Sequence, residues 1–339
     1  MKFNNQNKNI RVTIMIPTYN QEKYIAKSIQ SALLQDYPNI EVIVSDDSSR
    51  DNTKKIVNKF LINKKVKYYR NSKNIGKVKN YRKILYDYAT GDYVLNLDGD
   101  DYLIDKSYIS QAVDLINSND LVMVFAKQKV FLEKRFKLIE DKVNNKLHKI
   151  VEGNNLFINY YKGISIPHLT TIYNRKEAIK INYYKEDIIS SDWESVLRLM
   201  LNHKVGFINK FVGVWRKHSN NESRNIDIKK IVNNSKFIES PYTFARNKAI
   251  FSNKDLSRWR INMLKKYFIR SYVKVWFLDK KGCSTLLNYI KMQDFLIYKS
   301  LRKDLRFLFI KEIIKSEILS NILFKKVIKL ESFLEDLKK

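Results

Sequence analysis

The sequence predicts an α/β fold: a mainly parallel, Rossmann-like sheet with helices on both faces, followed by a basic α-helical region. Short apolar runs alternate with segments of helical periodicity over residues 11–105, and polar clusters follow three of those runs. From residue 240 onward, large apolar residues recur at helical spacing. We therefore expect a domain over residues 1–224 that binds a ligand, and a helical, basic region over residues 225–339.

The strands and helices are expected in strict alternation. The first strand, Arg11–Ile16, should end at Pro17, because proline cannot donate to a sheet, and a helix should follow at Gln21–Gln35. The later strands are expected at Ile40–Val44, Lys65–Tyr69 and Tyr93–Leu97, with helices at Asn52–Phe60 and Val78–Tyr88 between them.

Polar clusters follow the first, second and fourth of these strands: Pro17–Asn20, Asp46–Asp51 and Asp98–Asp101. Because ligands bind beyond the carboxyl ends of parallel strands, we expect the three clusters to form one site. Asp46 and Asp47 also suit a capped turn before a helix, and the sequence leaves that interpretation open.

The last cluster holds three carboxylates, Asp98, Asp100 and Asp101, around Gly99. Carboxylates this close repel one another unless a cation or hydrogen-bond donors lie between them. Mn²⁺ and Mg²⁺ prefer oxygen ligands and are often shared between carboxylates and substrate phosphates. Gly99 would allow a tight turn and a close approach of the backbone to a ligand. The pattern indicates a divalent-metal site, although a solvated acidic turn has the same composition.

Composition bounds the class of protein. The 339 residues, 44% of them apolar, are enough for a large core, and the one cysteine, Cys283, excludes an internal disulfide framework. The N-terminus lacks the apolar core of a signal peptide, and no run of about 18 apolar residues predicts a membrane span. We therefore expect a cytoplasmic protein.

The formal net charge of +29 favours polyanionic partners, namely nucleic acid, anionic lipid or phosphorylated substrates. Residues 241–339 carry a net charge of +14, whereas the much longer segment 1–240 carries +15. A nucleic-acid-binding protein is disfavoured, because the sequence has no zinc site or RNA-binding signature and its acidic clusters oppose a polyanion.

The basic C-terminal region leaves two interpretations open. Helices are predicted over Leu256–Phe277, Tyr289–Leu308 and Phe309–Leu337. They could form a bundle with solvated basic faces. Alternatively, one face could dock on an anionic membrane, because aromatic residues among Lys and Arg suit a lipid interface: Trp259, Tyr267, Tyr272 and Trp276.

Four stretches together resemble a non-processive, inverting family 2 glycosyltransferase of the GT-A fold: IMIPTYNQEKYIAKSIQSALLQDY, EVIVSDDSSRDNT, NIGKVKNYRKIL and GDYVLNLDGDD. SSDWESVLRL at 190–199 and VWRKHSNNES at 214–223 continue the family's pattern. The resemblance covers about two thirds of the chain, and the residues from about 225 onward do not share it.

The resemblance implies a nucleotide-diphospho-sugar donor, with UDP as the expected nucleotide. The residues that match the family's donor pocket are Pro17, Thr18, Tyr19, Asn20, Asp47, Asn74, Gly76 and Asn80. Of these, Tyr19 would stack on the base and Asp47 would accept from its ring N–H. Lys77 and Lys79 are expected to be surface residues.

The resemblance also assigns the metal site. Asp100 would be the direct ligand of Mn²⁺ or Mg²⁺, with Asp101 and His218 as further ligands. Asp98 and Gly99 would contact the donor, and Arg216 would pair with a phosphate oxygen. The metal would neutralise charge on the leaving diphosphate.

Asp192 matches the family's catalytic base, which is the second acid of a Glu-Asp pair; here Ser191 stands at the first position. Inversion needs one in-line displacement and one base for the proton of the acceptor hydroxyl. The serine therefore bears on acceptor recognition more than on the reaction. An alternative interpretation is that Asp192 only caps a helix over Trp193–Leu201.

These inferences predict a metal-dependent hexosyl- or N-acetylhexosaminyl-transferase. It would move one sugar from a UDP-sugar to a hydroxyl of a glycan or lipid-linked precursor of capsule, lipooligosaccharide, O-antigen or a similar surface polymer. The missing glutamate leaves a second candidate open, a catalytically silent relative that only binds the sugar nucleotide.

Overall fold

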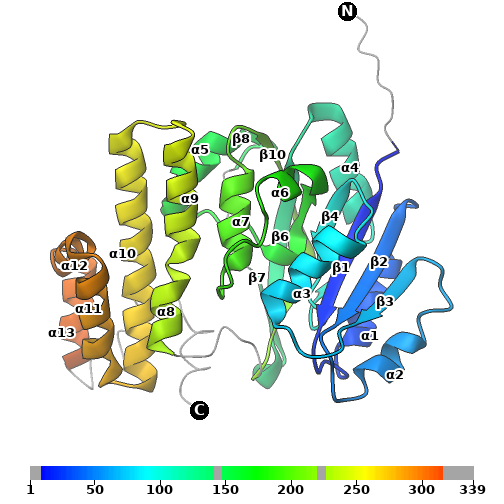
Figure 1. Cartoon of the computed structure of the whole chain (residues 1–339), viewed down its shortest axis with the longest axis horizontal. Coiled ribbons are helices and arrows are strands. Elements are labelled where there is room, and N and C mark those ends of the chain that lie inside the picture. Colours follow the sequence, from blue (N-terminus) through cyan, green and yellow to red (C-terminus); the bar gives the residue numbers. More distant parts are fainter. Residues whose placement is uncertain (1–8, 141–146, 220–226, 316–339) are drawn as a thin grey trace, which may run out of the picture. The chain divides into compact units, whose positions relative to one another are not determined.

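The computed structural model describes residues 9–140, 147–219 and 227–315 (Figure 1). The chain divides into two compact units, Met1–Ser219 and Asn220–Lys339, each with its own buried apolar residues. The boundary expected between residues 224 and 225 lies outside the described residues.

Unit 1 contains one sheet of ten strands, whose main path runs β3-β2-β1-β4-β9-β6-β10-β5. Strand β7 pairs with β6, and β8 pairs with β10. The strands are β1 (Val12–Thr18), β2 (Ile40–Asp46), β3 (Val66–Arg70), β4 (Tyr93–Asn96), β5 (Tyr102–Leu103), β6 (Met123–Leu132), β7 (Lys137–Glu140), β8 (Ile150–Glu152), β9 (Thr171–Asn174) and β10 (Lys204–Lys217).

The part of the sheet from β3 to β4 is parallel, as predicted. Every residue of β1, β2 and β4 is buried, which is typical of strands covered on both faces. Thr18 lies opposite Asp46 in the β1–β2 register, and the Gly99 N–H donates to the Pro17 carbonyl at 3.2 Å. The three polar clusters therefore meet at one edge of the sheet, which confirms the expectation from the sequence.

The sequence predicted that the first strand ends at Pro17. In the structure β1 continues through Pro17 to Thr18. Its parallel pairing with β4 stops at Met15 and Asn96. Pro17 has no N–H to donate, and none is needed toward β4, because the pairing with β4 has already ended there.

The part of the sheet beyond β4 is mixed. Strand β9 is antiparallel to both β4 and β6, whereas β6 is parallel to β10. Strand β10 has 14 residues and two register shifts against β6, between Ile208 and Phe211 and between Phe211 and Gly213. Past these shifts it also pairs with the short β5, which directly follows the acidic turn.

Helices cover both faces of the sheet (Figure 1). Val12, Ile14 and Ile16 share a core with α1 and α4, whereas α3 and the π-helix η1 pack on β1 from the other face. The helices of unit 1 are α1 (Ile25–Leu33), α2 (Thr53–Asn58), α3 (Lys77–Lys83), η1 (Ile84–Tyr88), α4 (Tyr108–Asn119), η2 (Glu133–Arg135), α5 (Gly153–Ile158), η3 (Tyr160–Lys162), η4 (His168–Thr170), α6 (Arg175–Lys180) and α7 (Ser191–Leu199).

Unit 2 is helical throughout the part that the structure describes. Its helices are α8 (Ile228–Asn234), α9 (Lys236–Asn247), α10 (Asn253–Leu278), α11 (Gly282–Gln293), α12 (Phe295–Arg302) and α13 (Leu305–Lys315). The single helix predicted over Tyr289–Leu308 is wrong: Asp294 separates α11 from α12, and its side chain accepts from the Ile297 N–H at 2.9 Å. The helix predicted over Phe309–Leu337 lies largely outside the described residues.

The aromatic residues proposed for a lipid interface do not form an exposed face. Trp259 and Tyr272 are buried, and the Tyr267 hydroxyl donates to the Ile231 carbonyl at 2.7 Å inside unit 2. That assignment is therefore wrong for Trp259, Tyr267 and Tyr272, whereas Trp276 is partly buried. Within residues 9–140, 147–219 and 227–315, no helix combines the length and the apolar character needed to cross a bilayer.

Candidate active site

The turn after β4 gathers the three acidic residues of the last polar cluster. One carboxylate oxygen from each of Asp98, Asp100 and Asp101 lies within 4.8 Å of the others. The Asp101 N–H donates to the Asp98 carbonyl at 2.9 Å and closes the turn. A Cβ added at Gly99 would overlap Gln21 Oε1, which itself accepts from the Thr18 hydroxyl. A larger residue would therefore displace the Gln21 side chain, because the turn packs closely against the end of β1.

Burial and neighbouring charges act differently on these carboxyls. Burial raises the pKa of Asp101 well above its usual range, and the negative charges of Asp100 and Asp98 raise it further. Burial acts in the same direction on Asp98, but Lys77, His168 and a hydrogen bond from Tyr81 outweigh it and lower the pKa of Asp98. Lys77, expected at the surface, is half-exposed, and its Nζ lies 3.5 Å from Asp98 Oδ2.

The donor set of this turn fits a hard divalent cation. A cation between the three carboxylates would relieve the repulsion that raises the pKa of Asp101, and carboxylate oxygens are preferred ligands of Mn²⁺ and Mg²⁺. His218 adjoins the group, because its Nε2 lies 2.8 Å from Asp100 Oδ2. Its ring stacks on Tyr24 with centroids 4.9 Å apart. The predicted ligands are thus brought together.

Arg216 supports the acidic turn from β10. Its backbone N–H donates to Asp101 Oδ1 at 2.8 Å, and its Nε donates to the Asp100 carbonyl at 3.0 Å. The guanidinium lies 4.9 Å from the ring centroid of Tyr24 and 5.5 Å from that of Tyr102. Arg216 therefore holds the turn in place, and its contact with a donor phosphate stays a prediction.

The loop after β1 forms the neighbouring part of the edge. Tyr19 is 42% exposed, so its ring is accessible for stacking, whereas Pro17 and Thr18 are buried. Asn20 has a left-handed backbone with φ 53°; its N–H donates to Ser49 Oγ at 2.9 Å and its Oδ1 accepts from the Arg50 N–H at 2.8 Å. Asn20 thus joins the first two polar clusters.

Asp47 is buried, and both of its oxygens have partners within the protein. Oδ1 accepts from Asn71 Nδ2 and from the Ile75 N–H, each at 2.9 Å, and Oδ2 accepts from the Gly76 N–H at 2.9 Å. Since a carboxylate can accept about four hydrogen bonds, one acceptor position on Oδ2 remains for a ring N–H of the nucleotide base. The main visible role of Asp47 is to hold the loop before α3.

The remaining residues predicted for the donor pocket lie in or beside that loop. Asn80 is buried: its Oδ1 accepts from the Ser45 hydroxyl at 2.6 Å, and its Nδ2 donates to the Ser45 carbonyl at 2.9 Å. It therefore holds β2 and α3 together. Gly76 has φ +92°, which favours glycine, and Asn74 is exposed at the loop tip.

Asp192 lies in the first turn of α7, where the helix begins at Ser191 after Ser190. Asp192 is not the capping residue, so the capping interpretation is wrong. Its Oδ2 lies 3.7 Å from His168 Nδ1, and 24% of its side chain is exposed. The His168 ring packs edge-on against Tyr81, whose hydroxyl donates to Asp98. Two rings therefore link the candidate base to the acidic turn.

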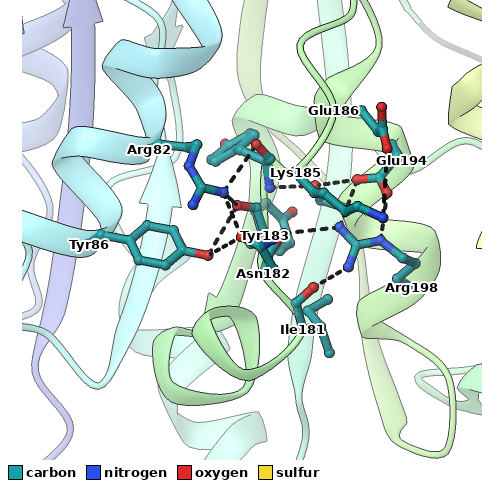
Figure 2. Close-up of polar contacts among 11 residues, drawn as sticks. Arg82, Tyr86, Ile181, Asn182, Tyr183, Lys185, Glu186, Glu194 and Arg198 are labelled. Carbon is teal, nitrogen blue, oxygen red and sulfur yellow. Dashed lines mark hydrogen bonds and ion pairs between the residues drawn. The ribbon is translucent and has the colours of Figure 1, made fainter. Parts of the chain in front are cut away.

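A second network fixes the loop before α7 (Figure 2). Buried Arg198 pairs with Glu194 at 2.6 Å and donates to the carbonyls of Ile181 and Asn182. From α3, Arg82 donates to the side chain of Asn182 at 2.8 Å and to the Tyr183 carbonyl at 3.0 Å. Figure 2 shows the two arginines approaching the loop from opposite sides. Arg198 lies on α7, which carries Asp192 in its first turn, so the network fixes the helix of the candidate base to this loop.

A family model described as Glycosyl transferase family 2 matches residues 13–179, a span that contains both acidic turns. The chain belongs to glycosyl transferase family 2.

Two relatives illustrate how far this family 2 chain resembles known proteins. Poly(ribitol-phosphate) beta-N-acetylglucosaminyltransferase TarS of Staphylococcus aureus is 34% identical over 122 residues, which cover 35% of this chain and 21% of TarS. UDP-Glc:alpha-D-GlcNAc-diphosphoundecaprenol beta-1,3-glucosyltransferase WfaP of Escherichia coli is 33% identical over 132 residues, or 37% of this chain and 48% of WfaP. The chain thus spans less than half the length of these curated relatives.

Solved structures share the fold of this family 2 chain. S. aureus TarS 1-349 in complex with UDP-GlcNAc superposes with a TM-score of 0.53 at 20% identity, covering 88% of this chain and 92% of that chain. The mannosyltransferase PcManGT of Pyrobaculum calidifontis, in complex with GDP-Man and Mn²⁺, has a TM-score of 0.54 at 14% identity and covers 94% and 88%. These likenesses confirm the predicted GT-A-like fold with a helical C-terminal region.

Sequence reasoning missed the residues that connect the two halves of the site. Tyr81 and Tyr184 stack with centroids 5.1 Å apart, and Tyr184 also bonds to Asn96 at the end of β4. Tyr81 sits among the apolar residues of a predicted helix, where an aromatic side chain is ordinarily part of the core. Nothing in the sequence placed its hydroxyl on Asp98.

Proposed function

We propose that this family 2 glycosyltransferase transfers a single hexosyl or N-acetylhexosaminyl group from a nucleotide-diphosphate donor to a hydroxyl of a surface-glycan precursor. The observation that carries the proposal is the three-carboxylate turn linked to Asp192 through Tyr81 and His168. UDP is the proposed nucleotide, because TarS was solved with UDP-GlcNAc and the name of WfaP specifies UDP-Glc.

The donor would lie along the sheet edge between the loops after β1 and β4. Tyr19 offers an accessible ring for the base, and the remaining acceptor position of Asp47 suits a ring N–H. Asn74 and the Gly76 backbone border the same loop. Lys77 carries a positive charge beside Asp98, where the diphosphate would meet the acidic turn.

The acidic turn is proposed to hold a divalent cation. Asp98, Asp100, Asp101 and His218 would bind Mn²⁺ or Mg²⁺, which when bound neutralises charge on the leaving diphosphate. Arg216 holds the acidic turn in place through its hydrogen bonds to the Asp101 side chain and to the Asp100 carbonyl. The structure of PcManGT with GDP-Man and Mn²⁺ supports this assignment.

Asp192 is proposed as the base of an inverting displacement. Its carboxylate accepts the proton of the acceptor hydroxyl while that oxygen attacks the anomeric carbon, and the bond from this carbon to the diphosphate oxygen breaks. His168 and the two-arginine network hold Asp192 in position. Ser191, in place of an acid, is buried, and its neutral hydroxyl contributes no charge to the acceptor side.

The acceptor is proposed to be a glycan or a lipid-linked glycan precursor. WfaP acts, by its name, on a sugar linked to diphosphoundecaprenol, and TarS on poly(ribitol-phosphate). Residues 225–339 are proposed as a region for packing, acceptor contact or association with an anionic membrane at the cytoplasmic side. No nucleic acid is proposed as a partner.

The test is a titration of the purified chain with UDP, with and without Mn²⁺, followed by turnover of UDP-sugars. We expect UDP binding that requires Mn²⁺, and Asp100→Ala should weaken it more than about tenfold. Asp192→Asn should keep the binding and lower the transfer rate by about 10²–10⁴-fold. Asp114→Ala, an exposed acid on α4, is the matched control and should change neither quantity.

The outcomes separate the candidates. Full transfer by Asp192→Asn would remove Asp192 as the base. Metal-dependent binding with no turnover of any sugar nucleotide would favour the catalytically silent relative. Failure of UDP, GDP and other nucleotides to bind in either condition would contradict the proposed donor class altogether.

A further inference from the structure

Six large apolar side chains are exposed on the last three helices that the structure describes. They belong to the end of α11, to the start of α12 and to α13: Met292 (84% exposed), Phe295 (56%), Leu296 (75%), Leu305 (81%), Leu308 (43%) and Phe309 (52%). We call this set the α11–α13 surface. Single exposed apolar residues are ordinary, but six within 18 residues of sequence indicate a contact surface.

The helices already have a separate buried side. On α12, Ile297 and Leu301 are one turn apart and each is 1% exposed, and on α13 Phe307 is 1% exposed. Helix α12 contacts α10, α11 and α13, and the Phe307 ring lies 5.0 Å from the ring of Tyr272 on α10. The exposed apolar residues therefore lie on a side of α12 and α13 that the folding of unit 2 does not require to be apolar.

The same helices carry basic residues beside the apolar ones. Lys299, Arg302 and Lys303 are exposed on and directly after α12. Two of the acids on or beside these helices are ion-paired inside unit 2: Asp294 lies 2.7 Å from Arg260 and Asp304 lies 2.9 Å from Lys265. Glu312, one acid on α13, is exposed. Within the part of the chain that the structure describes, the surface therefore combines exposed apolar groups with three exposed basic side chains.

We propose that the α11–α13 surface docks on an anionic lipid membrane. Leucine, methionine and phenylalanine side chains would enter the boundary between headgroups and acyl chains, while lysine and arginine contact anionic headgroups. This proposal names the surface for the membrane association given under the proposed function. It rests on the proposed function in one respect: docking would bring the enzyme to a lipid-linked acceptor. The helices would lie on the membrane rather than span it.

Charge argues against the other occupants of this surface. A second copy of the chain would present the same positive surface, and like charges would oppose the contact. Residues 316–339 contain five lysines and four acidic residues, so they bring no net negative charge to neutralise it. Nucleic acid would meet the lysines but would leave the leucine and methionine side chains in water.

The test is cosedimentation of the full chain with vesicles of phosphatidylcholine, with and without phosphatidylglycerol. We expect binding that needs phosphatidylglycerol and weakens as salt rises. The double variants Phe295→Ser/Leu296→Ser and Leu305→Ser/Phe309→Ser should each weaken vesicle binding by about tenfold or more. The triple variant Lys299→Glu/Arg302→Glu/Lys303→Glu should abolish it.

Matched control variants change exposed apolar and basic residues of unit 1, outside the α11–α13 surface. Leu61→Ser/Ile62→Ser changes two exposed apolar residues, and Lys54→Glu/Lys55→Glu/Lys59→Glu changes the net charge by the same amount as the triple variant. Both controls should bind vesicles as the unaltered chain does. UDP binding in the presence of Mn²⁺ should be unchanged in every variant, so that a failed donor assignment and a failed membrane assignment are told apart.

Three results would overturn the proposal. The first is a chain that does not bind the anionic vesicles at all, and the second is full binding by the surface variants. The third is self-association, measured by sedimentation velocity, that is lost in the serine variants while vesicle binding persists. That result would assign the surface to a second copy of the chain.

Discussion

The two acidic turns on either side of β1 have the same residue type at the same kind of strand end, but their carboxylates have different partners. After β2, Asp47 accepts three hydrogen bonds from the loop before α3, and Asp46 accepts from Ser49 and Tyr68. After β4, Asp98, Asp100 and Asp101 face one another within 4.8 Å, and the pKa of Asp101 is raised. The first turn satisfies its charges with protein donors. The second turn also receives hydrogen bonds, from Tyr81 and from the Arg216 N–H, but its three carboxylates still lie within 4.8 Å of one another.

Structural and functional acids at the edge of one sheet can be distinguished by the partners of their carboxylate oxygens. A carboxylate whose oxygens accept from backbone N–H groups lowers the free energy of the folded chain by itself. Carboxylates held close together repel one another, and a cation that joins them relieves this repulsion. Removing an acid should therefore have opposite effects at the two turns.

The largest effect is expected at the first turn. Asp47→Ala leaves the donors of Asn71, Ile75 and Gly76 without their acceptor, and should lower the free energy of unfolding by about 3 kcal/mol. Urea denaturation without metal measures it, with Asp114→Ala, an exposed acid on α4, as the control that should keep the midpoint. An unchanged midpoint for Asp47→Ala would contradict the structural role.

A smaller effect is expected at the opposite end of β2. Burial alone would raise the pKa of Glu41, but hydrogen bonds from Thr13, Thr90 and Lys67 lower it to about 2. Because the folded-state pKa lies below the ordinary value of 4.5, Glu41 stabilises the fold above pH 4.5, and this contribution is lost as pH falls toward 2. Glu41→Gln should lower the free energy of unfolding by about 2 kcal/mol at pH 7.

The Glu41 prediction is checked by urea denaturation of both proteins at pH 7 and near pH 3. The difference between the two proteins should shrink at the lower pH, because Glu41 of the unfolded chain, with its ordinary pKa of 4.5, is then protonated while Glu41 of the folded chain is still largely ionised. A difference that is equal at both pH values would mean that the charge of Glu41 contributes nothing.

The smallest effect, with the opposite sign, is expected at the second turn. Asp101→Asn keeps an acceptor for the Arg216 N–H but removes one of three crowded charges. In EDTA this variant should be as stable as the unaltered chain or more stable by about 1 kcal/mol, whereas the stabilisation given by Mn²⁺ should fall. Thermal unfolding with and without Mn²⁺ measures both, and a marked loss of stability in EDTA would remove the contrast between the turns.

The sequence was sufficient to predict the parallel part of the sheet and the edge at which the polar clusters meet. Apolar runs such as Ile40–Val44 and the acids that follow them are local signals, and parallel strands bring their carboxyl ends together. The antiparallel strand β9 between β4 and β6 was not predicted. It has only four residues, and no local pattern in the sequence indicates which strands they pair with.

The partners of the site residues could not be predicted in the same way. Asp47 is held by residues 24 to 29 positions later, and Tyr81 reaches Asp98 from a helix on one face of the sheet. Such contacts depend on how helices pack, and no local pattern encodes them. The same reason explains why Trp259, placed on a lipid face by its basic neighbours, is instead buried.

The register shifts in β10 have a consequence for exchanging parts between related chains. Between Ile208 and Gly213 the strand departs twice from regular pairing with β6, and only after that do Arg216 and His218 point to the acidic turn. Because side chains alternate along a strand, one inserted or deleted residue in this stretch would turn both away from Asp100. A chimaera that carries the helical region of another chain should therefore be joined after His218.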